Sequence, residues 1–148
     1  MTDIKRDTGF WLRAFGIGIA VSILTAAIML AAIAAGMSPF PKPPSLAFAE
    51  TILGRSLPLP VGLLFHTAYV TFWSMVFVGF FPRRDLKTAI YLAGVLWIIL
   101  LVVFFPLVGW GFAGLSVSPQ LIPASLVPHL AFGILLWGFE RFLPGAGQ

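Results

Sequence analysis

Long apolar runs separated by short polar or proline-rich segments dominate the chain. Uncharged runs cover residues 14–36, 57–81 and 88–139. One crossing of the hydrocarbon core takes about 20 residues of helix. The third run has 52 residues, which as one helix would be about 78 Å long, so it must fold back. Pro and Gly between positions 106 and 123 mark the reversal. The pattern therefore predicts four spans, at about 14–36, 59–81, 88–108 and 125–142.

Composition agrees with an all-α integral membrane protein. The 148 residues are 59% hydrophobic and only 9% charged, whereas a soluble domain carries about 25% charged residues. The mean hydropathy is +1.02. We expect one domain over residues 1–148, a bundle of four transmembrane helices with the lipid bilayer around it. The chain has no cysteine, which excludes thiolate chemistry and disulfides.

The first apolar run also resembles a signal peptide, because basic residues precede it and Ala-Ala-Gly ends it. A signal h-region has only about 7–15 residues, so we expect a retained helix instead. Small residues recur along this helix at four-residue spacing, which predicts a close packing face. They are Gly16, Ala20, Ala27, Ala31 and Ala35.

The connections between the spans differ in character. Residues 37–56 contain four prolines, after which Ser45 is a suitable cap for a short helix that ends at Gly54. We expect that helix to lie on the membrane surface, with a gating lid as the alternative. The connection 109–124 is apolar but irregular, so it should be tucked against protein or lie at the interface. Pro128 is expected in the first turn of the last helix.

Lys and Arg divide unequally between the two sides of the membrane. Two of them, Lys42 and Arg55, fall in the first connection. By the positive-inside rule, both termini should be cytoplasmic. Because the basic residues cluster at span ends, we expect no nucleic-acid partner. The seven basic residues on the expected cytoplasmic side are Lys5, Arg6, Arg13, Arg83, Arg84, Lys87 and Arg141.

A short repeat places two histidines inside the spans. Pro60-x5-His66 is followed by Ala68-Tyr69, and Pro123-x5-His129 by Ala131-Phe132. A tryptophan, Trp73 or Trp137, follows each histidine by two turns. The second and fourth spans run in the same direction, so both imidazoles should lie at similar depth, roughly 8–12 Å inside the outer boundary.

Three hypotheses explain the histidines. First, each neutral imidazole bonds to a nearby backbone group or hydroxyl; the candidates are Thr67, Tyr69, Thr71 and Ser74. Second, the pair serves a proton or small-solute path, because imidazole titrates near neutral pH. Third, the pair binds haem or a metal between facing helices, with Gly62 or Gly133 leaving room. Without a carboxylate or thiolate the pair makes a poor dedicated metal site.

No enzymatic motif is recognisable. The sequence has no Ser/His/Asp set, phosphate loop, pair of catalytic carboxylates or zinc motif. Glu140-Arg141 is expected to be a solvated helix end that meets Arg83 or Arg84. The aromatic residues are expected to contact lipid rather than to form a ligand cage. We therefore expect no enzyme, no catalytic residue, no metal and no cofactor, with haem as the exception that the third hypothesis allows.

Several short motifs resemble the small YagU-type inner-membrane proteins of bacteria. They are the Pro41–Ser45 segment, Phe81-Pro82, Phe105-Pro106-Leu107-Val108-Gly109, His129-Leu130, Trp137 and Glu140-Arg141. The resemblance covers residues 40–142, with a shorter first connection and a different spacing from His66 to Pro82. It implies a multi-span inner-membrane protein with a loose link to acid stress and no established enzymatic activity.

The leading functional hypothesis is a non-enzymatic inner-membrane protein that acts through helix contacts. It would be an accessory subunit of a membrane complex or a homo-oligomer, so its partners would be other membrane-protein subunits or itself. The alternative is a proton or small-solute transporter or channel that uses His66 and His129. The third hypothesis is a bis-histidine haem protein.

Overall fold

The computed structural model describes residues 7–143, which are helical with no strand. Four helices are long and apolar enough to cross a membrane. They are α1 (Thr8–Ala34), α3 (Leu59–Phe80), α4 (Leu86–Ile99) with its continuation to Leu107, and α6 (Leu121–Phe142). The expected all-helical fold with four apolar spans is confirmed for this part of the chain.

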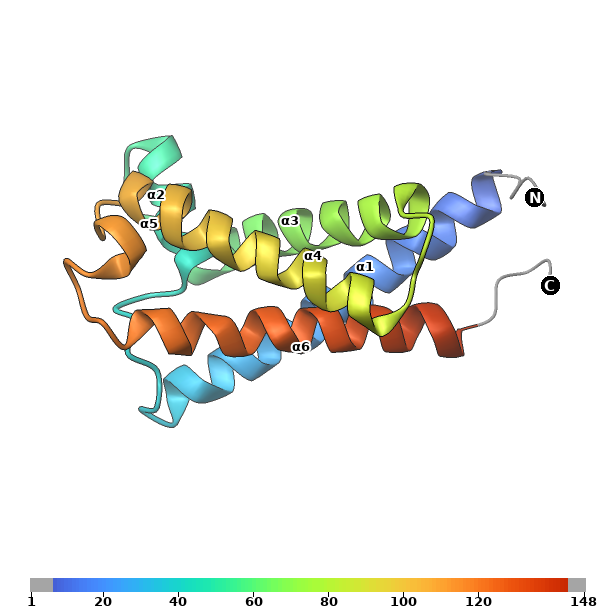
Figure 1. Cartoon of the computed structure of the whole chain (residues 1–148). Helices are drawn as coiled ribbons and strands as arrows, with labels where there is room; N and C mark the ends of the chain where they lie inside the picture. The colour runs from blue at the N-terminus through green and yellow to red at the C-terminus, as the bar shows by residue number, and fades with distance from the viewer. Residues whose placement is uncertain (1–6, 144–148) are drawn as a thin grey trace.

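The shorter elements lie at one end of the bundle. Helix α2 (Pro44–Leu53) precedes α3, and α4 continues through a π-helical turn, Leu100–Phe104, into α5 (Phe105–Leu107). A 3₁₀ turn covers Phe112–Gly114. We call this end the loop end, and the opposite end, with the hinge between α3 and α4 at residues 81–85, the hinge end. The start of α1 and the end of α6 lie at the hinge end (Figure 1).

Local sequence explains the helix limits. The side chain of Asp7 accepts a hydrogen bond from Phe10 N, and that of Asp85 accepts one from Thr88 N, so each caps a helix start. Helix α2 ends at Gly54, whose φ of +64° suits glycine. Helix α1 begins before residue 14 and so includes Arg13.

The start of α6 corrects one expectation. The helix begins at Leu121 rather than near residue 125, so Pro123 lies in its first turn and Pro128 lies in its interior. We expected Pro128 in the first turn, where its missing N–H does no harm. In the interior it leaves the carbonyl of Ala124 without the usual donor four residues on.

The close helix contacts are α1 with α3, α1 with α6, and α4 with α6. Helices α3 and α4 follow one another in the chain, yet their backbones make almost no close contact. Glycines mark the tightest approaches: a Cβ added at Gly18 would lie 2.7 Å from Cα of Thr71. The expected small-residue face of α1 is not the packing face within this chain, since Gly16, Ala27, Ala31 and Ala35 are exposed and Ala20 is only half-buried.

The packed interior forms two clusters. The larger joins α1, α3, α4 and α6 toward the hinge end, around Phe77 and Leu136. The smaller lies at the loop end around Phe105 and Trp110, so the irregular connection 109–124 is tucked against protein at Trp110, Ala113, Gly114 and Leu121, while most of its other residues are exposed. The cavity described below is lined by residues of both clusters.

Helix α2 is docked onto α3 rather than lying free. Leu46 and Ala49 are buried, and a Cβ added at Gly62 would lie 2.6 Å from Cβ of Leu46. Leu53, expected on the same face as Leu46 and Ala49, is 48% exposed. The contact places α2 beside the half of α3 that lies at the loop end (Figure 1).

Candidate functional site: a cavity between the helices

A cavity of about 280 Å³ lies among all the spans, near the loop end. It occupies the region where the backbones of α3 and α4 stay apart. Its walls are apolar and aromatic, and the few polar groups among its lining residues are Thr25, Ser45, His66, Tyr69, Ser125 and His129. The other lining residues are Met29, Phe40, Pro44, Phe48, Phe65, Val70, Trp73, Leu96, Leu100, Phe104, Pro128 and Phe132.

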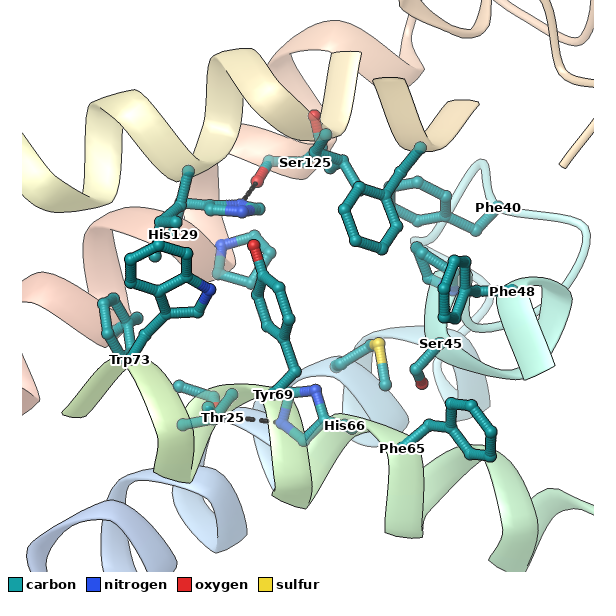
Figure 2. Close-up of a pocket in the computed structure, with 18 residues that line it drawn as sticks. Thr25, Phe40, Ser45, Phe48, Phe65, His66, Tyr69, Trp73, Ser125 and His129 are labelled. Atoms are coloured by element: carbon teal, nitrogen blue, oxygen red, sulfur yellow. Dashed lines mark hydrogen bonds between the residues drawn. The ribbon is translucent and has the colours of Figure 1, made fainter. Parts of the chain in front are cut away.

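His66 is fixed by α1. Its Nε2 atom lies 3.1 Å from Oγ1 of Thr25 and 3.2 Å from the carbonyl oxygen of Ser22. Because a carbonyl oxygen only accepts, Nε2 of the neutral ring carries the proton. Thr25 in turn donates to the carbonyl of Val21. The Nδ1 atom of His66 therefore keeps its lone pair, and Figure 2 shows it away from the bond to Thr25.

His129 is fixed by its own helix. Its Nδ1 atom lies 2.8 Å from the carbonyl oxygen of Ser125 and, by the same rule, donates to it. The hydroxyl of Ser125 is used elsewhere: it donates to the carbonyl of Ile122 and accepts from Nε1 of Trp97. The Nε2 atom of His129 is left with an unshared lone pair.

The two imidazoles belong to one site. His66 projects from α3 and His129 from α6 toward the same space, with the ring of Tyr69 between them in this view (Figure 2). Each imidazole bonds to a backbone carbonyl, as the first hypothesis allowed, but none of the side chains named there is its partner. Ser74 donates to the carbonyl of Val70, and the buried hydroxyl of Thr71 has no partner within residues 7–143.

The space that the haem hypothesis needed is filled by protein. Gly62 packs against Leu46, and a Cβ at Gly133 would lie 3.1 Å from the carbonyl oxygen of Ala89. Both glycines serve helix contacts instead of opening a pocket. The histidines also present different nitrogens, Nδ1 of His66 and Nε2 of His129. Among residues 7–143 there is no group of three or more His, Cys, Asp or Glu that could hold a metal ion.

Aromatic side chains bridge α3 to the end of α4 across the cavity, which is a role the sequence analysis missed. The ring of Phe48, from α2, lies 5.0 Å from that of Phe104 and 6.1 Å from that of Phe65. Tyr69 lies 5.7 Å from Phe104. The four-residue spacing of Phe65, Tyr69 and Trp73 places them on one helix face. That spacing was the available signal, and lipid contact is not their only role.

A cluster of ion pairs joins the helices at the hinge end. Glu140, whose side chain is 9% exposed, pairs with Arg13 and with Arg84, each at 2.8 Å. Arg13 also donates to the carbonyl oxygens of Glu140 and Leu143, at the carboxyl end of α6. Of the two arginines expected near Glu140, Arg84 is in contact and Arg83 is exposed. Glu140 thus joins α1, the hinge and α6.

Glu50 ties the two connections around α2 together at the loop end. Its carboxylate lies 2.6 Å from Nζ of Lys42 and accepts a hydrogen bond from Leu57 N at 3.1 Å. The hydrogen bond from Lys42, and then that from Leu57, lower the pKa of Glu50 below its usual value. The ionised carboxylate therefore holds α2 in place beside the cavity.

A scan against models of protein families and searches of curated proteins and of solved structures found no match to this chain. The likeness to YagU-type proteins therefore stays a resemblance. What the chain defines by itself is a four-helix bundle of membrane-spanning type with an aromatic cavity between its helices.

Proposed function

We propose that the chain is a non-enzymatic membrane protein that binds a small lipophilic molecule between its spans. One observation carries the proposal: the cavity joins apolar, aromatic walls to two imidazoles, each with one nitrogen free. Sites for small molecules are mostly apolar and contain a few polar groups that orient the ligand. The volume, about 280 Å³, suits a molecule of one or two rings.

The packing of the interior favours binding of a molecule over its passage through the bundle. The transporter alternative requires such passage. Between the cavity and the hinge end, Ile17, Phe77 and Leu136 are at most 2% exposed and belong to one packed cluster. In the part of the chain that the structure describes, no Asp, Glu, Lys or Arg lines the cavity to continue a proton relay from the histidines. An accessory-subunit or homo-oligomer role is compatible with ligand binding, because such contacts would use the outer surface of the bundle.

We further propose that the protein lies in a bacterial inner membrane with both termini in the cytoplasm, as the distribution of Lys and Arg indicates. The cavity would then open within the outer half of the bilayer. Because the chain has no cysteine, single cysteines report topology directly. In intact cells, a membrane-impermeant maleimide should label Ser56→Cys, at the loop end, and not Lys87→Cys, at the hinge end. The reverse pattern would invert the orientation.

Filling the cavity should remove the bound molecule. Val70 lines the cavity and is 6% exposed, so Val70→Phe adds volume inside it. Val127→Phe adds the same volume at a position of α6 that is 59% exposed, and it serves as the matched control. Native mass spectrometry of protein taken from its own membranes should show a retained small molecule in the wild type and the control, and none in Val70→Phe.

A direct probe complements that experiment. Binding of 4-fluorotoluene in nanodiscs, followed by ¹⁹F NMR against empty nanodiscs, should be saturable for the wild type and Val127→Phe and lost for Val70→Phe. A wild type that retains no small molecule and binds the probe no better than empty nanodiscs do would overturn the proposed function.

A further inference from the structure

We propose that the cavity recognises a neutral hydroxyaromatic molecule, a phenol or quinol, whose hydroxyl group donates a hydrogen bond to a free imidazole nitrogen. This inference rests on the proposed function and specifies its ligand class. It follows from which nitrogen of each ring is already used.

Each imidazole already uses its N–H group in a hydrogen bond to the protein. Both rings face a backbone carbonyl oxygen with one nitrogen: Nε2 of His66 faces Ser22, and Nδ1 of His129 faces Ser125. A neutral imidazole has one N–H donor and one acceptor nitrogen. Since a carbonyl takes the donor in each case, both rings keep only an acceptor. A ligand that bonds to either ring must bring the donor.

The other nitrogen of each imidazole is available to a ligand. No residue among 7–143 forms a hydrogen bond to Nδ1 of His66 or to Nε2 of His129. Ser45 reaches the cavity from α2 with a buried hydroxyl that also has no partner. The hydroxyl of Ser45 rotates to donate or to accept, so it does not select between ligands. The imidazoles do.

The cavity wall carries no permanent charge: among residues 7–143, no Asp, Glu, Lys or Arg lines it. A cationic donor such as an ammonium group would therefore lose its hydration without gaining a counter-ion, which is strongly unfavourable. A neutral hydroxyl donates at far smaller desolvation cost.

Aromatic side chains determine the shape of the cavity. Phe48, Phe65, Tyr69, Trp73 and Phe104 surround the space, with neighbouring ring centroids 5.0–6.3 Å apart. Aromatic walls favour a flat ring through offset or edge-to-face contacts. A ring that carries a hydroxyl group meets both demands. A quinone, whose carbonyls only accept, can bond to the hydroxyl of Ser45 but to neither imidazole, so the cavity should prefer the reduced, quinol form, which can bond to both kinds of group.

Two isomeric probes measure the contribution of the hydrogen bond to the binding free energy. 4-Butylphenol and 4-propylanisole contain the same atoms, but only the phenol donates. Binding is measured with the full chain in nanodiscs and referred to the probe concentration in the lipid of empty nanodiscs. The phenol should bind about tenfold more tightly, the difference expected for one hydrogen bond of ordinary strength. In ¹⁵N NMR, the non-protonated imidazole nitrogens should shift with the phenol and not with the anisole.

Variants assign the hydrogen bond to its histidine. His129→Phe or His66→Phe, whichever removes the contact, should abolish the preference, so that the phenol and the anisole bind with equal affinity, whereas Val127→Phe should keep the preference. Should both variants fail to fold, the ¹⁵N shifts of the wild type decide by themselves.

The outcomes also separate this inference from the proposed function. Equal, saturable binding of both isomers that Val70→Phe abolishes would overturn the hydroxyaromatic class and leave the proposed function standing. Binding of neither isomer, with a small molecule still retained from native membranes, would do the same. Binding of neither isomer, with nothing retained and no saturable binding of 4-fluorotoluene, would overturn both.

Discussion

Replacing Gly18 by leucine should destabilise the bundle by about 3 kcal/mol, which is the upper part of the range for overpacking. A Cβ at this position would lie 2.7 Å from Cα of Thr71 and 2.9 Å from its Cγ2. Cα is a backbone atom that cannot rotate away, so α1 and α3 must separate. Equilibrium unfolding in mixed detergent micelles measures the change. Because the separation also moves Thr25 away from His66, binding of the cavity ligand should weaken in the same variant.

Gly16 provides the matched control two residues earlier in the same helix. It is exposed, and a Cβ there would meet no atom within 4 Å. Gly16→Leu should therefore change the free energy of unfolding by no more than about 0.5 kcal/mol. Equal destabilisation by the two variants would show that the contact with Thr71 does not govern the effect, because leucine has a higher helix propensity than glycine at both positions.

Replacing Glu140 by glutamine should lower the free energy of unfolding by about 2–3 kcal/mol. The substitution keeps the shape of the side chain but leaves Arg13 and Arg84 without their shared carboxylate. The arginine side chains are only 20% and 22% exposed, so water replaces the lost partner poorly, and breaking such a pair is far more costly than losing a surface ion pair. The same unfolding measurement applies.

Arg141→Gln is the control for a change of one charge at the end of α6. Arg141 is exposed and makes no ion pair among the described residues. Its loss should have an effect within about 0.5 kcal/mol. If Glu140→Gln were equally mild, the cluster would contribute little to joining α1, the hinge and α6.

The helices could be predicted from the sequence because the pattern that marks them is local. Uncharged runs and the Pro and Gly residues between them are enough to place four apolar helices. The start of α6 was missed because Pro123 was taken as part of the chain reversal, whereas it lies in the first turn of the helix. The packing face of α1 was missed because spacing alone does not say which face of an Ala-rich helix meets its neighbour; the buried face carries Ile17, Gly18 and Val21 instead.

The site was predictable only in part. The repeat at Pro60 and Pro123 indicated that the two histidines share a depth, and in the structure both line one cavity. Their partners were out of reach, because His66 bonds to Ser22 and Thr25 across more than 40 positions of sequence. The bond from His129 to Ser125 depends on where α6 begins. The cavity itself arises from the separation of α3 and α4, which no local pattern encodes.

Because α3 and α4 are apart, a molecule bound in the cavity would contact both pairs of helices. Helices α1 and α3 form one pair and α4 and α6 another, and the pairs touch directly through α1 and α6. On the opposite side, Tyr69 and Phe48 meet Phe104 only through their rings. A molecule held there becomes shared interior for both pairs, as a core residue would be. Under the proposed function, the stiffness of this side of the bundle would depend on how much of the ligand the surrounding membrane contains.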